Sequence, residues 1–283
     1  MTMAPSPAQT QRHMLPPPPS SRMLVDPEYL LEELMKEAMA PRHAQAGGPH
    51  GERPEAAGPP VRAMGGYGSG RREMNFSVVR LQGLMYSWSC SWVANQIYAA
   101  YADPAIDGIL LEVNTGGGEV SAAQMVAGAV TDGPKPVVTY AHYAASGGIM
   151  ATTGSTEIVA SGKLSRFGSI GVMMTAPKWM AKVYSDYFEE LYADTSPEKN
   201  AAWRDYIKSL QTDRFIAMLN EIDQVFMEQV ITDRNLPAGK LREETLKGGT
   251  WMAEESKRRG LVDSIGNFNY ALERLASHAA AQS

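Results

Sequence analysis

Apolar residues follow two alternating patterns along the chain from Asn75 onward. Alternating or continuous apolar runs predict strands, whereas apolar positions three or four residues apart predict helices. The predicted strands are residues 76–81, 106–113, 136–140, 158–160 and 171–174. The predicted helices are residues 91–102 and 121–131, one that begins at Ser146, and residues 203–234 and 252–259. Strands joined by crossover helices indicate an α/β domain, and the chain turns helical toward its C-terminus.

The first 75 residues have a different composition. They contain the run Pro16–Pro19 and several glycine pairs, with few β-branched or aromatic residues to build a core. We therefore expect residues 1–75 to be a mostly disordered arm. Within it, residues 27–39 predict a short helix with Asp26 as its N-cap. This helix would dock a partner, pack on its own domain or be a marginally stable helix within a tail. A folded domain over residues 76–275 and a C-terminal tail over residues 276–283 complete the predicted organisation.

Composition limits the classes of function. The chain has 283 residues, 44% of them apolar, which is ample for an independent core. A net charge of −5 and the lack of a basic, aromatic-rich stretch argue against nucleic acid as a partner. The single cysteine, Cys90, excludes an internal disulfide and a cysteine-rich zinc site. No apolar stretch reaches the roughly 18–20 residues that span a bilayer. We expect a cytoplasmic protein with no membrane anchor, metal or organic cofactor.

The segment Tyr140–Ile149 carries the strongest chemical signal. A strand-like run ends in Ser146, which two glycines follow. Such a turn exposes a serine beside free backbone N–H groups, as an acyl-transfer nucleophile requires. The alternative is a strand-to-helix loop whose serine caps the helix.

A nucleophilic serine needs a proton acceptor, and histidine is the first candidate. His142 precedes Ser146 by four residues, or about 13 Å along an extended strand, which is too far for direct proton transfer. The other histidines lie in the N-terminal arm or near the C-terminus: His13, His43, His50 and His278. A Ser-His-Asp triad is therefore not expected. A lysine kept neutral by burial is the remaining base, and composition does not select one.

Four motifs occur in order along the chain: Ile109–Gly118, Ala144–Gly148, Phe167–Val172 and Gly260–Gly266. Together they resemble the signal peptide peptidase A (SppA) family of Ser-Lys peptidases, over about residues 76–275. The closest resemblance is to its short phage and prophage branch, the head-maturation proteases. The resemblance implies a ClpP/crotonase-like fold of repeated β-β-α units with a helical C-terminal region.

The resemblance also implies a catalytic pair. Ser146 matches the family's nucleophile, and Lys199, 53 residues later, matches its general base. The family usually has a glycine shortly before this lysine, whereas this chain has Ser196–Glu198. Lys182 and Lys208 are lesser candidates. Judged without the resemblance, Lys199 is a solvated lysine in a loop before a helix.

Further site residues follow from the same resemblance. Ser169 matches a serine that orients the lysine, although it also suits a turn between strands. Gly147 and a glycine of the Gly116–Gly118 run match the donors of the oxyanion hole. Gly117 is the first choice and Gly118 the second. By itself this run is an ordinary glycine-rich turn, and it does not fit a dinucleotide-binding loop.

Two departures affect this loop. Gly116 stands where the family usually has proline, which would make the loop more flexible. Glu119 follows the glycines and would either repel acidic substrates or serve as a first-turn acid of the next helix.

The resemblance implies a serine endopeptidase that cleaves a polypeptide, such as a phage capsid or scaffold protein, in the host cytoplasm or prohead. It also implies a homo-oligomeric ring whose subunits share the site. Three alternatives remain open at this point. The chain could be a soluble housekeeping peptidase that degrades small peptides, a crotonase-type acyl-CoA enzyme, or a catalytically silent scaffold-binding protein.

Overall fold

The computed structural model describes residues 61–65, 72–176 and 178–282. The helix predicted at residues 27–39 and most of the predicted N-terminal arm lie outside these residues. Residues 61–65 and 72–75 of that arm are described, and both segments are strand.

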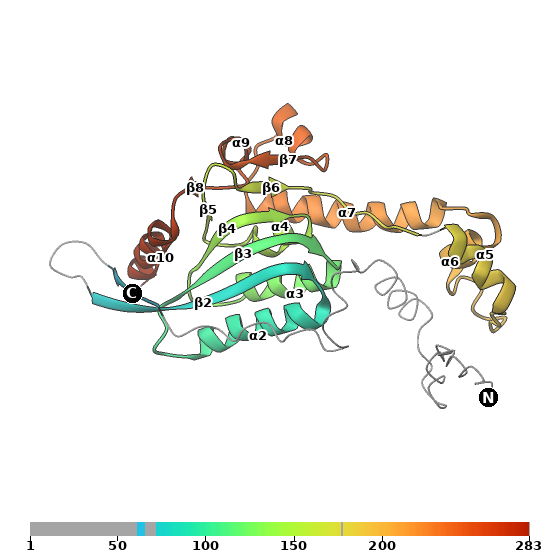
Figure 1. Cartoon of the computed structure of the whole chain (residues 1–283), viewed down its shortest axis with the longest axis horizontal. Coiled ribbons are helices and arrows are strands. Elements are labelled where there is room, and N and C mark those ends of the chain that lie inside the picture. Colours follow the sequence, from blue (N-terminus) through green and yellow to red (C-terminus); the bar gives the residue numbers. More distant parts are fainter. Residues whose placement is uncertain (1–60, 66–71, 177, 283) are drawn as a thin grey trace, which may run out of the picture. The chain divides into compact units, whose positions relative to one another are not determined.

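An eight-stranded sheet organises the described residues (Figure 1). The strands are β1 Val61–Gly65, β2 Arg72–Met85, β3 Gly108–Gly118, β4 Val137–Ala145, β5 Glu157–Ala160, β6 Arg166–Gly168, β7 Thr250–Met252 and β8 Ser264–Ile265. The main path runs β1-β2-β3-β4-β5-β8, and β2 to β8 along this path are parallel. β1 is antiparallel to β2, while β6 pairs in parallel with the end of β4 and in antiparallel fashion with β7. The parallel strands therefore bring the ends of β3, β4 and β6 together.

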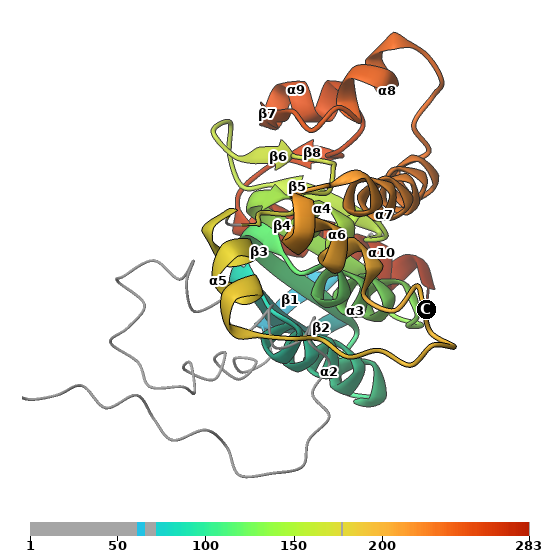
Figure 2. The same cartoon turned by 90° about the vertical axis from the view of Figure 1, so that its right-hand side faces the viewer.

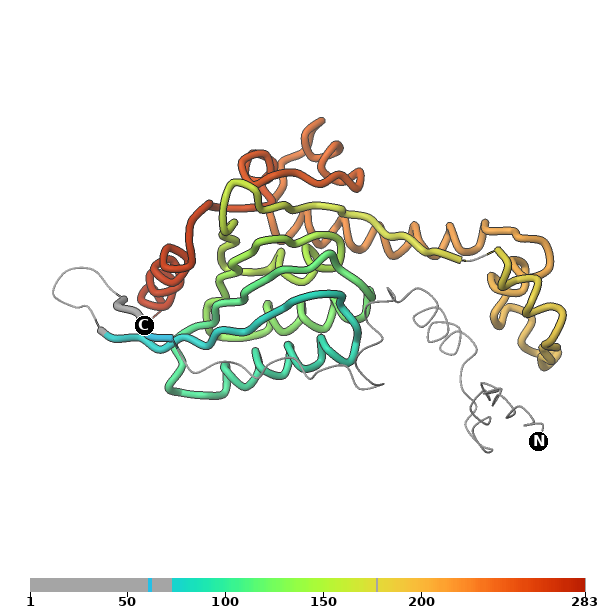
Figure 3. Tube along the Cα trace, viewed as in Figure 1, coloured from blue at the N-terminus to red at the C-terminus, as the bar shows by residue number. Residues whose placement is uncertain are grey.

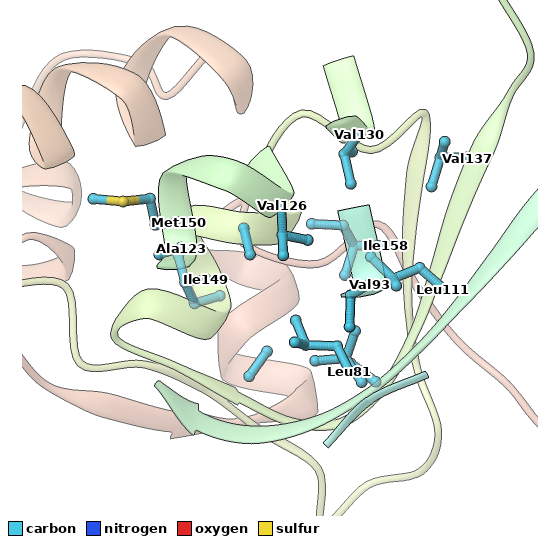
Figure 4. Packing of buried hydrophobic residues seen from close by; sticks show 14 of the residues in the cluster. Leu81, Val93, Leu111, Ala123, Val126, Val130, Val137, Ile149, Met150 and Ile158 are labelled. Carbon is cyan, nitrogen blue, oxygen red and sulfur yellow. The ribbon is translucent and has the colours of Figure 1, made fainter. Parts of the chain in front are cut away.

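Helices cover the sheet on both faces. One face packs under α2 Ser87–Ala102, α3 Val120–Thr131 and α4 Gly147–Thr152, and the other under α10 Phe268–Gln282. In β3, Leu111 belongs to the core below α2 to α4, where Figure 4 shows it near Val93 and Ile158. The adjacent Leu110 belongs to the core below α10. Successive side chains of a strand point to opposite faces, so a continuous apolar run fits a strand covered on both sides. In Figure 3 the trace ends in α10, which contacts β1, β3 and β4.

The chain between β6 and β7 leaves the sheet. It forms α5 Lys178–Tyr187, α6 Ala201–Ser209, α7 Asp213–Asp233 and α8 Lys240–Thr245, and α9 Ala253–Arg258 follows β7. From here on, the word arm means residues 178–212, and not the N-terminal residues 1–75. It packs on the first turn of α7, where Arg214 Nε donates to Asp205 Oδ2 at 2.9 Å.

The other end of α7 is fixed to α4. Gln229 Nε2 donates to the Met150 carbonyl at 2.9 Å, and Thr153 Oγ1 donates to Asp233 Oδ2 at 2.6 Å. A helix rises 1.5 Å per residue, so Arg214 and Gln229 are about 22 Å apart along α7. The arm is thus attached far from α4, at the opposite end of α7 (Figure 1), and Figure 2 looks along α7 from the end that carries the arm.

The predicted α/β class is confirmed, and β2 to β5 correspond to the first four predicted strands, although β3 and β4 begin one or two residues later than predicted. The strand predicted at residues 171–174 is wrong. The chain turns away after β6, because Gly168 and Ser169 have φ of 125° and 53°. The single helix predicted over residues 203–234 is also wrong: Leu210, in the left-handed region at φ 55°, ends α6 before α7 begins. α10 continues to Gln282, so it includes most of the expected C-terminal tail.

Candidate active site

Ser146 occupies a sharp turn between β4 and α4. Its φ and ψ are 51° and −122°, a conformation that residues with a side chain rarely adopt. Two sets of backbone hydrogen bonds hold it there. Ser146 N donates to Gly168 O at 2.9 Å, and Ser146 O accepts the first bond of α4 from Ile149 N at 2.9 Å. Ser146 is half-buried among fully buried neighbours. A serine on a strained strand-to-helix turn has the backbone geometry of a nucleophile elbow.

The glycine-rich end of β3 lies directly against this elbow. A Cβ on Gly117 would lie 2.7 Å from Gly147 N and 2.9 Å from Ser146 Cβ, and Gly117 has φ 97°. Both facts require glycine at this position. The predicted residues Ser146, Gly147 and Gly117 are therefore in contact.

The two candidate oxyanion donors of β3 differ in their surroundings. Gly117 N donates to Thr115 Oγ1 at 3.0 Å, and Thr115 Oγ1 donates to Gly83 O at 2.5 Å. Gly117 is buried, whereas Gly118 is exposed. Gly118 N lies 3.4 Å from the position that a Cβ of Gly147 would take. The geometry thus favours Gly118 over Gly117 as the donor that faces the elbow. Sequence reasoning missed Thr115, whose hydroxyl just before the glycines was the available signal.

Ser169 directly follows β6, the strand that pairs with the end of β4. β4 and β6 are paired at Ala145 and Gly168, so Ser146 and Ser169 each follow the last pair of the two strands. Ser169 N donates to Gly249 O at 2.6 Å, which fixes the turn after β6. The register therefore brings the predicted lysine-orienting serine beside the predicted nucleophile.

The three candidate lysines all belong to the arm. Lys182 lies in α5, Lys208 in the last turn of α6, and Lys199 in the turn just before α6. Each of the three residues is exposed. Within the part of the chain that the structure describes, no hydrogen bond joins any of them to Ser146 or Ser169. Within the described residues, the predicted nucleophile and its predicted base are therefore not hydrogen-bonded to each other.

His142 and Glu119 have other partners. His142 Nδ1 lies 2.7 Å from Ser161 Oγ, and its Nε2 lies 4.0 Å from Glu112 Oε1. Glu119 Oε2 accepts from Ser87 N at 2.8 Å and from Ser87 Oγ at 2.5 Å, so its carboxylate binds the first residue of α2. Glu119 is also the N-cap residue of α3. A carboxylate is favourable at the N-terminus of a helix, and Glu119 lies at the N-termini of both α2 and α3, which explains its position.

The described residues contain neither a metal-binding cluster nor a membrane-spanning helix. Among them, no group of three or more His, Cys, Asp or Glu side chains is arranged to hold a metal ion. In the same residues, no helix combines the length and apolar character needed to cross a bilayer.

The sheet, the strained serine and the glycine loop behind it define an α/β protein with an acyl-transfer type of site. Residues 129–282, just over half of the chain, match the sequence profile of a family described as Peptidase family S49. The chain belongs to this family, whose fold is ClpP/crotonase-like. The matched segment contains Ser146, Ser169 and Lys199, and it begins after the glycines of β3.

Individual relatives agree with this family. The chain is 29% identical over 194 residues to Protease 4 of Salmonella typhi, a match that covers 66% of this chain and 30% of that protein. It is 32% identical over 181 residues to a protein of Methanocaldococcus jannaschii whose name describes a protease, covering 61% of this chain and 56% of that protein. A protein of Enterococcus faecium named as an SppA signal peptide peptidase is 28% identical over 191 residues, which is 64% of this chain and 53% of that protein. The matches thus span about a third to a half of these relatives.

Proposed function

We propose that the chain is a serine endopeptidase in which Ser146 attacks the peptide carbonyl. The single observation that carries this proposal is the elbow: a serine at φ 51° whose backbone is in contact with Gly117 and whose N–H is bonded to Gly168 O, in a member of a peptidase family. Such a turn positions the hydroxyl before substrate arrives, which lowers the cost of reaching the transition state.

The oxyanion hole is formed by the N–H groups of Gly147 and Gly118. Gly147 is the first residue of α4, and the first N–H groups of a helix have no acceptor within the helix. Gly118 is chosen over Gly117, because the Gly117 N–H donates to Thr115 Oγ1. Two donors that converge on the developing negative charge stabilise the tetrahedral intermediate.

Lys199 is the proposed general base, and Ser169 orients its amine. The amine accepts the Ser146 hydroxyl proton as the Ser146 Oγ–carbonyl carbon bond forms. It then donates this proton to the leaving amine when the peptide bond breaks, and water hydrolyses the acyl-enzyme. To act in this way the amine must be neutral, and enclosure away from water favours the neutral form.

A second copy of the chain supplies Lys199. Two observations support this: the arm is attached about 22 Å along α7 from α4, and the arm carries exposed apolar side chains. Trp179, Phe188 and Leu191 are 62%, 62% and 87% exposed. Apolar surface of this kind marks a contact with another protein, and contact with a neighbouring elbow would both cover it and desolvate Lys199.

The proposed substrate is a phage capsid or scaffold protein, and the support is the resemblance to the head-maturation branch. The test incubates wild type and the variants Ser146→Ala, Lys199→Ala and Lys208→Ala with such a substrate, and identifies fragments by mass spectrometry. Ser146→Ala and Lys199→Ala should abolish specific fragments, with kcat reduced by on the order of 10⁵ or more for the serine. The control variant Lys208→Ala, which removes another exposed lysine of the same arm, should cleave the substrate normally.

Each contrary result has a distinct meaning. Identical fragments from wild type and Ser146→Ala would refute the proposed nucleophile. Normal cleavage by Lys199→Ala would refute the proposed base. Cleavage of small peptides but of no capsid or scaffold protein would favour the housekeeping role.

A further inference from the structure

The turn that carries Lys199 is fixed at several points, while its side chain is left exposed. Arg204 donates to the Pro197 carbonyl, and Arg214 Nη1 binds Glu198 Oε2 at 2.7 Å. On the other side of the lysine, Asn200 has left-handed backbone geometry at φ 55° and precedes α6. In the described part of the chain, the Lys199 ammonium has no hydrogen bond or ion pair.

Glu190 lies at the centre of the contacts that hold Asn200. Its Oε1 accepts from Tyr184 Oη at 3.0 Å and from Asn200 Nδ2 at 3.3 Å, and its Oε2 accepts from Tyr192 Oη. Asn200 Nδ2 also lies 3.3 Å from Tyr192 Oη. One carboxylate therefore joins α5, the loop after it and the residue next to Lys199.

Two neighbouring interactions stabilise this arrangement. The Arg204 guanidinium lies over the Tyr192 ring, 4.6 Å from its centroid, while the same residue donates to Pro197. Burial, together with the hydrogen bond to Glu190, raises the pKa of Tyr184 to about 12. The Tyr184 hydroxyl thus keeps its proton and continues to donate to Glu190 at neutral and moderately alkaline pH.

We propose that Glu190 is a positioning residue, which acts through Tyr192 and Asn200 to hold the backbone of Lys199 in the place where its amine can reach the active serine. This inference rests on the proposed role of Lys199 as base. A lysine side chain has many rotamers, so the position of its Cα decides how often the amine reaches a given point. Supporting residues of this type keep a catalytic group within the narrow range that the reaction needs.

The first test compares Glu190→Gln with Glu189→Gln, its exposed neighbour, in the assembled full-length protein. The Glu190→Gln substitution removes one of the two carboxylate oxygens, so the side chain can no longer accept from Tyr184, Asn200 and Tyr192 together. We expect kcat to fall about 10- to 100-fold, because a misplacement of about 1 Å can have that effect, with KM unchanged. Tyr192→Phe, a milder change, should show the same pattern to a smaller extent.

The second test separates positioning from general support of the fold. The labelling rate of Ser146 by a phosphonate ester is measured by intact mass for Lys199→Ala and for Lys199→Ala with Glu190→Gln. If Glu190 acts through Lys199, both rates should agree within about two-fold, because residues that act as a unit are non-additive. The positioning role would be overturned if Glu190→Gln lowered the labelling rate in the Lys199→Ala background by the same factor as it does when Lys199 is present.

The two proposals fail in different ways. Normal kcat in Glu190→Gln beside an inactive Lys199→Ala overturns the inference alone. Full activity of Lys199→Ala overturns the proposed base, and the role assigned to Glu190 with it.

Discussion

The elbow at Ser146 and the turn at Lys199 are held in opposite ways. The elbow is fixed by the sheet: its neighbours are buried, and its conformation follows from strand pairing and close backbone contact with Gly117. The Lys199 turn is fixed by polar side chains on a surface arm, and its own side chain is exposed. The half-buried, strained Ser146 and the exposed Lys199 need different supports, because strain persists only where the surroundings determine it fully.

The strongest test of this contrast asks whether the two halves of the site come from different copies. Ser146→Ala and Lys199→Ala should each be inactive when expressed alone. Coexpressed in equal amounts, they should regain about one quarter of wild-type activity if each site takes its serine and its lysine from different copies in a cyclic assembly. Peptidase assays on purified mixed assemblies measure this recovery.

The control for that mixture is a double variant, Ser146→Ala with Lys199→Ala, coexpressed with wild type at the same ratio. Mixed assemblies that form but recover no activity from the two single variants would place both residues in the same chain. In that case the arm would have to move relative to α4.

The next prediction concerns the backbone contact behind the elbow. Gly117→Ala would place a Cβ 2.7 Å from Gly147 N at a φ of 97°, so the loop or the elbow must shift. We expect kcat to fall by at least about 100-fold, given that small misplacements of reacting groups have this effect. Gly116→Ala is the matched control, because its Cβ would meet only Tyr143 Cε1, at an ordinary 3.6 Å. Equal activity of the two variants would contradict the fixed geometry of the loop.

The same contrast explains what could be predicted from the sequence. The positions of the strands along the chain and the elbow have local signals, namely apolar runs followed by small residues, and the sequence correctly places Ser146 at the end of β4. The register that brings Ser169 beside Ser146 is a long-range pairing, for which the sequence has no local signal. The role of Ser169 is therefore predicted only from the resemblance to the family.

The arm was less predictable. Residues 203–234 have continuous helical periodicity, yet the helix is interrupted at Leu210. Contacts between α6 and α7, such as the hydrogen bond from Arg214 to Asp205, stabilise the turn at this position. The choice between Gly117 and Gly118 also depended on tertiary structure. Only the placement of the Thr115 hydroxyl shows that the Gly117 N–H already has an acceptor.

A smaller effect is expected at Thr115, which is 1% exposed. Thr115→Val removes the acceptor of the Gly117 N–H and the donor to Gly83 O, and leaves the buried Gly117 N–H without this partner. We expect a loss of about 1–3 kcal/mol in the free energy of unfolding and a fall in kcat of roughly 10-fold. Thr115→Ser keeps the hydroxyl and should retain both properties. Thermal unfolding and steady-state kinetics distinguish the variants, and a Val variant with normal values would show that this hydroxyl does not organise the loop.

The smallest effect concerns stability alone, and it compares an ion cluster of the sheet with one of the arm. Glu157 in β5 is 5% exposed and accepts from Ser264, Arg274 and His278, at 2.8, 2.7 and 2.9 Å. Burial opposes its ionisation, but the hydrogen bonds from His278, Arg274 and Ser264 outweigh burial and hold the pKa of Glu157 below its ordinary value of 4.5.

A lowered pKa in the folded state means that ionised Glu157 stabilises the fold above about pH 4.5, and that this contribution is lost as the pH falls through the folded-state pKa. Glu157→Gln should therefore lower the free energy of unfolding by about 1–3 kcal/mol at pH 7. In acid, the free energies of unfolding of the variant and of wild type should differ less. Glu198→Gln, which removes the exposed ion pair between the arm and Arg214 of α7, should leave the pH dependence of unfolding unchanged. Urea unfolding between pH 3 and 7 tests both variants, and equal acid sensitivity of wild type and Glu157→Gln would show that this carboxylate does not hold α10 to the sheet.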